Sequence, residues 1–267
     1  TEIYTLSLHD ALPIYGNLLN LVKLPVSRLS QIVSKVAFPA FASVQDDLAL
    51  FRRGYVQAIA GISSLTFPLL IGLAIFSREV VILLFSSKYE DMVQPLIILV
   101  PYAMLKSVVT IKGSVLIARR RPGIELAWNV VYMLPFAVSI YIGARYGLVG
   151  VACAFTGLYL LTFPIIQTIT NRQVNLTNRD FVMALWPAFA SAMFMLAAGL
   201  VFRYVMSLVG PWPVLVTLIT GVPLLGSSYL LFMWFVFRRQ SEEIRSLWSL
   251  VKKSNRNSER VVESDTI

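Results

Sequence analysis

Long apolar stretches alternate with short charged segments along most of the chain. A helix needs about 20 mostly apolar residues to cross a bilayer, and the pattern predicts helices of this kind at roughly 54–76, 92–117, 124–144, 148–170, 181–205 and 212–237. A further segment, 16–42, is apolar and also carries cations. If it crosses as well, the fold class is an all-α polytopic membrane protein with about seven transmembrane helices.

The first of these segments is amphipathic over its whole length. On a helical wheel, most polar residues between 17 and 37 fall on one half, and they include the cations Lys23, Arg28 and Lys35. Charges inside a membrane usually mark functional sites, so we expect the polar half to line a wet cavity. A helix lying flat at the interface would show the same pattern, and a soluble helix is a third interpretation.

The span 92–117 adds a lysine near its middle. Lys106 shares an arc of the helical wheel with Ser107, Thr110 and Ser114. Lys112 points elsewhere and lies near the end of the span, so we expect its amine to extend to the membrane surface.

These two helices together predict a cationic cavity. The predicted spans hold no acidic residue deep enough to neutralise Arg28 or Lys106. A cationic cavity suits an anionic substrate such as a diphosphate or an acidic sugar. The candidate lining residues are Lys23, Arg28, Gln31, Lys35, Lys106 and Thr110.

Cations between the spans predict the orientation. One side of the membrane carries Arg52, Arg53, Arg119, Arg120, Arg121, Arg172, Arg179, Arg238 and Arg239. The other side has Arg78, Lys88 and Arg145, with Arg203 near the boundary. By the positive-inside rule the first side is cytoplasmic, which places the C-terminus inside.

Composition agrees with a membrane protein. Hydrophobic residues are 57% and charged residues 14% of the chain, against about 25% charged residues in soluble domains. The net charge of +9 is spread between the spans, so we expect membrane lipids and no nucleic acid as partners. With one cysteine and one histidine, no disulfide framework, metal site or cofactor is expected.

The two ends of the chain differ from the rest. Residues 1–14 resemble a translated sequencing adapter, and we expect them to be non-native and the chain to lack a preceding part. Residues 240–267 are predicted to form a cytoplasmic tail. Its start, SEEIRSLWSLVKK, has apolar residues at helical spacing, which fits either a short helix on the membrane surface or a solvated tail.

Several ordered motifs carry a family resemblance. They are LPVSRLSQIVSKVAFPAFASVQDD, LTFPLLIGLAIFSREVVILLF, GSVLIARRRPGIEL and YGLVGVACAF. Together they resemble the Wzx-type polysaccharide exporters, which are lipid-linked oligosaccharide flippases of the multidrug/oligosaccharidyl-lipid/polysaccharide superfamily. Two segments depart from that family. The chain reads SSKY where the family usually shows Gly and Trp, and ARRRPG where it shows a small-Gly-Arg step.

The resemblance implies an organisation and a function. The chain would be the C-terminal part of a fourteen-helix, two-lobe transporter. Residues 15–170 would form an incomplete second six-helix lobe, and 171–239 two additional transmembrane helices. The function implied is translocation of undecaprenyl-diphosphate-linked oligosaccharide across the inner membrane for surface polysaccharide export. The lipid-linked glycan and the missing N-terminal lobe would then be partners.

Other functions stay open at this point. A drug/cation antiporter of the same superfamily would use carboxylates inside the membrane, and the predicted spans lack them. A membrane-embedded glycan polymerase or acyltransferase would need acid, base or phosphate-binding groups in a long outer loop, and segment 77–91 offers few. We therefore expect no enzymatic activity. A purely structural membrane subunit is the remaining alternative.

Overall fold

The computed structural model of the chain describes residues 47–210 and 212–236. All regular elements in these two ranges are helices. They are α2 (Leu48–Ile75), α3 (Ser77–Phe85), the 3₁₀ helix η1 (Ser87–Met92), α4 (Val93–Val109), α5 (Lys112–Ala118), α6 (Pro122–Ala144), α7 (Gly147–Gln173), α8 (Asn178–Val209) and α9 (Val214–Val236).

Six helical segments in the described ranges are long and apolar enough to cross a membrane. They are Leu48–Ile75, Ser87–Ala118, Pro122–Ala144, Gly147–Gln173, Asn178–Leu208 and Val214–Val236. Each contains most of one predicted span, so the all-α polytopic fold class is confirmed. The predicted helix 16–42, the segment 1–14 and the tail 240–267 lie outside the described residues.

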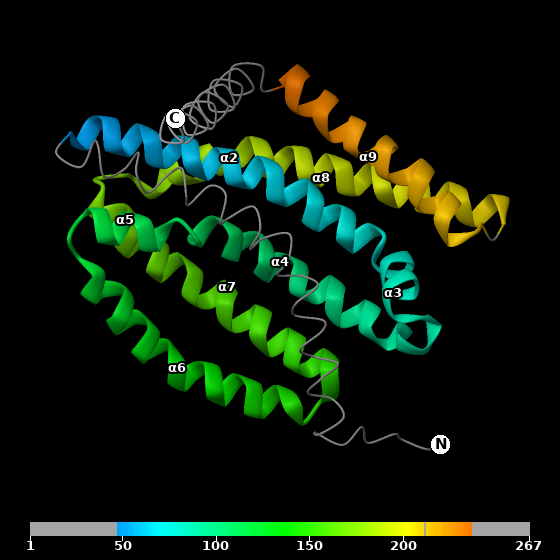
Figure 1. Ribbon diagram of the computed structural model, residues 1–267, viewed down its shortest axis with the longest axis horizontal. Coiled ribbons are helices and arrows are strands. Elements are labelled where there is room, and N and C mark those ends of the chain that lie inside the picture. Colours follow the sequence, from blue (N-terminus) through cyan, green and yellow to red (C-terminus); the bar gives the residue numbers. More distant parts are fainter. Residues whose placement is uncertain (1–46, 211, 237–267) are drawn as a thin grey trace, which may run out of the picture.

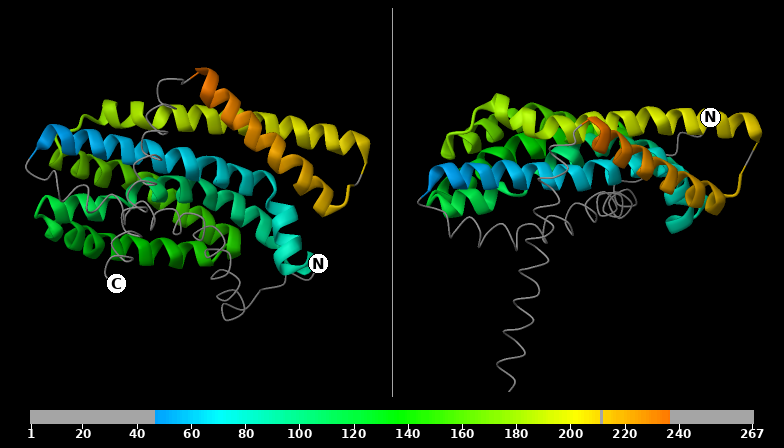
Figure 2. Two further views of the ribbon diagram at one scale, coloured as in Figure 1. Left: turned by 45° about the horizontal axis from the view of Figure 1, so that its top comes forward. Right: turned by 90° about the horizontal axis from the view of Figure 1, so that it is seen from above.

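The long helices pack side by side in an order that differs from their order in sequence. α6 packs on α7, α7 on α4, α4 on α2, α2 on α8 and α8 on α9. The first five run nearly parallel or antiparallel, whereas α9 crosses the others obliquely in two views (Figures 1 and 2). The predicted division into a lobe and two additional helices stays a prediction.

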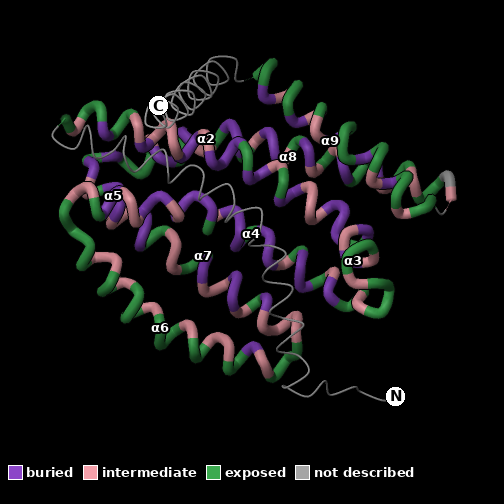
Figure 3. The backbone as a smooth tube through the Cα atoms, viewed as in Figure 1, coloured by how far each residue is buried: buried purple, intermediate pink, exposed green. Residues whose placement is uncertain are grey.

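Burial differs sharply between the helices. In the most apolar part of Ser87–Ala118, 61% of residues are buried, against 6% in Pro122–Ala144. Figure 3 accordingly shows α6 exposed or partly exposed along most of its length. Its exposed large apolar side chains are Leu126, Val130, Val131, Met133, Leu134, Val138, Tyr141 and Ile142. An apolar surface this large is unfavourable in water, so this face of α6 is lipid-facing in an integral membrane protein.

Two proline-containing helices accept hydrogen bonds at a backbone carbonyl from a side chain on a neighbouring helix. Pro68 has no backbone N–H, so the carbonyl of Ser64, four residues earlier, loses its helical donor. The hydroxyl of Tyr229 on α9 donates to that carbonyl at 3.0 Å. Close to Pro101, the hydroxyl of Thr156 on α7 donates to the Ile98 carbonyl at 2.9 Å. These bonds join the proline-containing helices α2 and α4 to their neighbours.

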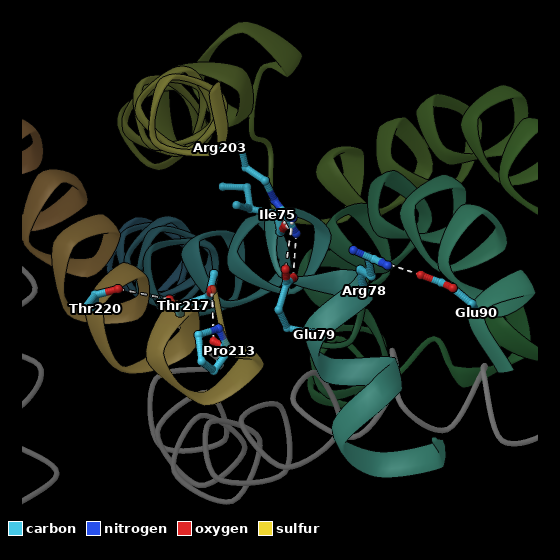
Figure 4. A network of polar contacts seen from close by, with 8 residues as sticks. All are labelled: Ile75, Arg78, Glu79, Glu90, Arg203, Pro213, Thr217 and Thr220. Carbon is cyan, nitrogen blue, oxygen red and sulfur yellow. Dashed lines mark hydrogen bonds and ion pairs between the residues drawn. The ribbon is translucent and has the colours of Figure 1, made fainter. Parts of the chain in front are cut away.

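An arginine from α8 closes the end of α2. Arg203 Nε donates to the carbonyl of Ile75 at 3.0 Å, and its Nη1 donates to Glu79 Oε1 at 3.0 Å (Figure 4). Helix α2 ends at Ile75, so the carbonyl of Ile75 lies at a helix terminus, where helical donors run out. Glu79 is only 7% exposed, so the guanidinium satisfies a buried carboxylate and a helix terminus together.

Candidate functional site

The span that carries Lys106 is interrupted. The sequence predicts one helix over 92–117, and the structure divides the segment into η1, α4 and α5. The second break falls at Thr110 and Ile111, between the end of α4 and the start of α5. Thr110 and Ile111 both keep right-handed helical angles, so the break is a local irregularity within one candidate membrane span.

Lys106 lies in the last turn of α4, and its side chain is exposed. Its amine lies 6.0 Å from the centroid of the Tyr159 ring on α7, which is within range of a cation–π interaction. The negative end of the α4 dipole also favours a cation here. Thr110 donates its hydroxyl to the Lys106 carbonyl at 3.0 Å. The structure therefore brings these two predicted site residues together.

An aromatic cluster from three helices supports Lys106. Tyr102 on α4 contacts Phe155 and Tyr159 on α7 edge to face, with ring centroids 4.6 and 4.9 Å apart. Phe136 on α6 contacts Phe155 in the same manner at 5.3 Å. Such pairs prefer specific geometries, so the cluster fixes the orientation of the ring beneath the lysine. This cluster was not predicted from the sequence, although Tyr102 and Lys106 stand four residues apart.

The predicted polar arc around Lys106 is wrong in one residue. Ser107 is fully buried, and its hydroxyl lies 2.9 Å from that of Thr66 on α2. Neighbouring residues point about 100° apart on a helix, so the arc that joined Lys106 and Ser107 crosses from the exposed surface into the α2–α4 contact. Ser107 therefore holds helices together and does not line the same surface.

The expectation for Lys112 is also wrong. Its side chain is 7% exposed, and its amine lies 3.6 Å from Glu125 Oε1. Helix α6 folds back directly after α5, which brings the first turn of α6 over the start of α5. Because a buried cation needs a partner, the ion pair within the molecule replaces the expected extension to the membrane surface.

The remaining predicted site residues cannot be placed. Lys23, Arg28, Gln31 and Lys35 lie outside the described residues. Within the described part of the chain, the candidate site is Lys106 with Thr110 and the aromatic cluster of Tyr102, Phe136, Phe155 and Tyr159.

A buried polar network near the other end of α7 was not predicted. Gln167 donates to the hydroxyl of Tyr55 at 2.9 Å and to Asn171 Oδ1 at 2.8 Å. Asn171 donates to Asn178 Oδ1 at 2.9 Å, and Asn178 donates to the Thr168 hydroxyl at 3.0 Å. The network joins α2, α7 and α8. Gln167 and Asn171, polar residues one turn apart in an apolar helix, are the signal that could have revealed it.

A pocket of about 480 Å³ lies at the end of α4 opposite to Lys106. It is lined by Glu90, Asp91, Val93, Gln94, Ile97, Tyr146, Leu148 and Val149. Arg78 forms an ion pair with Glu90, which raises the pKa of Arg78 above its usual value.

Among the described residues, no group of three or more histidine, cysteine or acidic side chains could hold a metal ion.

Known proteins match much of this chain. Residues 6–94 match a family described as "Polysaccharide biosynthesis protein". The chain is 31% identical over 182 residues to the lipopolysaccharide biosynthesis protein WzxC of Escherichia coli (strain K12), covering 66% of this chain and 36% of that protein. It is 29% identical over 157 residues to the teichuronic acid biosynthesis protein TuaB of Bacillus subtilis (strain 168), covering 58% and 32%.

A third relative is described as an uncharacterized membrane protein in the cps region of Klebsiella pneumoniae. It is 30% identical over 142 residues, covering 53% of this chain and 29% of the relative. No solved structure matches. The chain thus spans about a third of the length of the curated relatives it matches. It is a membrane protein related to the polysaccharide biosynthesis proteins, and its resemblance to the Wzx-type polysaccharide exporters is confirmed.

Proposed function

We propose that the protein containing this chain moves an undecaprenyl-diphosphate-linked oligosaccharide across the bacterial inner membrane, as a step in surface polysaccharide export. The step is translocation and involves no covalent chemistry. Two relatives are named for the biosynthesis of lipopolysaccharide and of teichuronic acid, and both names fit a polysaccharide substrate.

The observation that carries the proposal is Lys106. It is an exposed cation inside an interrupted membrane span, held beside Tyr159. A diphosphate crossing the membrane needs a positive partner, because leaving water without one is costly for a charged group. The aromatic rings next to the lysine can also pack against the apolar faces of sugars. Lys106 would therefore bind the anionic part of the substrate, together with Arg28 in the segment that is not described.

An antiporter for cations or drugs is the alternative within the superfamily. It would favour carboxylates deep in the membrane. In the described ranges, the carboxylates of the six candidate spans occur in the first turns of those spans: Glu90, Asp91, Glu125 and Asp180. Their position supports the flippase proposal over the antiporter.

The proposal includes an orientation. The ends where α2 and α8 begin and α5 and α7 finish lie together at one side of the bundle (Figure 1). The described arginines of the predicted cytoplasmic side belong to these ends, and we propose that this side faces the cytoplasm.

The test replaces Lys106 and Arg28 by glutamine in the chromosomal gene, singly and together, and measures protein abundance in the membrane and surface polysaccharide. A binding role predicts normal abundance with reduced export, because glutamine keeps bulk and hydrogen bonding but removes the charge. Lys88→Gln, an exposed cation at the other end of the bundle, is the matched control. Unchanged export in the double variant would contradict the proposal. Lost abundance would instead show that the lysine and arginine pair with buried carboxylates.

A further inference from the structure

The turn between α5 and α6 contains three consecutive arginines, Arg119–Arg121, in an unusual backbone conformation. The N–H of Arg121 donates to the Leu116 carbonyl at 2.8 Å, and the N–H of Arg120 donates to the Ile117 carbonyl at 2.9 Å. This pair of bonds is the Schellman motif that ends many helices. It requires the residue after the cap, here Arg120, to adopt a left-handed conformation, and φ of Arg120 is 57°.

A second turn in the chain has the same backbone motif, so the residues at the two left-handed positions can be compared. Helix α7 ends in the same motif, with Leu176 donating to the Asn171 carbonyl and Asn175 donating to the Arg172 carbonyl. Asn175 occupies the left-handed position there, with φ of 50°. Glycine and asparagine adopt this conformation readily, whereas other side chains are strained in it. Arg120 therefore places a charged side chain at a position where the backbone favours glycine or asparagine.

Two arginines of this turn, Arg120 and Arg121, are available to a ligand. Arg120 and Arg121 are exposed, and neither forms an ion pair within the described residues. The nearest carboxylate on α6, Glu125, already pairs with Lys112. Arg52, which lies at the same end of the bundle, is in contrast paired with Asp180 at 3.0 Å.

The depth of the turn indicates the partner. Ser87–Ala118 ends directly before the three arginines, and Pro122–Ala144 begins directly after them. Both segments are candidate membrane spans, so the turn lies at the level of the lipid headgroups. The face of α6 that follows is apolar and exposed, and it offers a surface for acyl chains.

We propose that Arg120 and Arg121 form a binding site for the phosphate headgroup of an anionic phospholipid, whose acyl chains lie against α6. An arginine that directly contacts the headgroup of an anionic lipid contributes about fivefold to the affinity for that lipid. The site is separate from the candidate substrate site at Lys106.

The experiment measures lipid binding to the purified full-length protein by native mass spectrometry in a neutral detergent. Dioleoyl phosphatidylglycerol is compared with dioleoyl phosphatidylcholine at equal concentration. The wild type is expected to bind phosphatidylglycerol preferentially. Arg120→Asn and Arg121→Gln should each reduce this preference about fivefold. Because asparagine tolerates the left-handed turn, Arg120→Asn should keep or raise the temperature of unfolding.

Two variants serve as controls. Arg53→Gln removes an exposed charge from the same end of the bundle, and Lys88→Gln removes one from the other end. Both should leave the lipid preference unchanged. Equal binding of the two lipids by the wild type, or an equal loss with Arg53→Gln, would overturn the proposal. Displacement of phosphatidylglycerol by an equal concentration of undecaprenyl diphosphate, abolished by Arg120→Asn, would also overturn it by assigning the turn to the transport substrate. Export is not measured, so the result does not depend on the proposed function.

Discussion

At the scale of single residues, the ion pair between Arg203 and Glu79 is the most consequential contact outside the candidate site. Removing the arginine leaves a carboxylate that is 7% exposed without its partner, and frees the Ile75 carbonyl. We expect Arg203→Ala to lower the free energy of unfolding by about 3 kcal/mol. Thermal unfolding in detergent measures this loss as a lower midpoint.

A matched variant separates this effect from a simple loss of charge. Arg145 is exposed and hydrogen-bonds to Tyr141 on its own helix. Arg145→Ala should therefore change the midpoint of unfolding little. Equal shifts for the two variants would show that the Arg203 contact contributes nothing specific.

Residue-level predictions from the sequence succeed where the spacing along one helix alone decides which side chains lie together. Lys106 and Thr110 lie together as predicted, because they stand one turn apart on α4. The environments of Ser107 and Lys112 depend on which helices pack against α4 and α5. A helical wheel has no information about that packing, so both expectations failed for the same reason.

At the scale of helices, the proline position in α2 is coupled to the neighbouring helix α9. Tyr229 satisfies the carbonyl that Pro68 leaves without a donor. We expect Tyr229→Phe to lower the free energy of unfolding by about 1 kcal/mol. Tyr204→Phe is the control, since that residue is 66% exposed on α8.

A double-mutant cycle tests the coupling directly. Pro68→Ala supplies a backbone N–H to the Ser64 carbonyl, so Tyr229→Phe should become close to neutral in that background. An undiminished loss in the Pro68→Ala background would show that the hydroxyl acts elsewhere.

Helix existence was predictable, and helix continuity was not. Long apolar runs predict all six candidate spans because burial of apolar surface in lipid dominates their placement. The interruption at Thr110 and Ile111 has no proline or glycine at the break, and both residues keep right-handed helical angles. The residues at the break therefore contain no sequence signal that would have predicted it.

At the scale of the whole molecule, the alternation of charge predicts which ends of the helices share a side. Cysteines placed at Ser87 and Ser207 should react with an impermeant thiol reagent in intact cells, and one at Thr177 should not. All three positions are exposed. The background needs Cys153→Ala, since Cys153 is exposed. Labelling at Thr177 alone would show that the protein has the opposite orientation in the membrane.

The proposed function is the movement of a lipid-linked glycan from the cytoplasmic leaflet to the outer leaflet of the membrane. The most direct measurement is its distribution between the two leaflets of spheroplasts, in a strain whose chromosomal gene is deleted and complemented with the wild type or with the Arg28→Gln, Lys106→Gln variant. The account predicts that the glycan accumulates in the cytoplasmic leaflet on deletion, reaches the outer leaflet with the wild type, and is largely retained inside with the variant. An unchanged distribution after deletion would contradict the account.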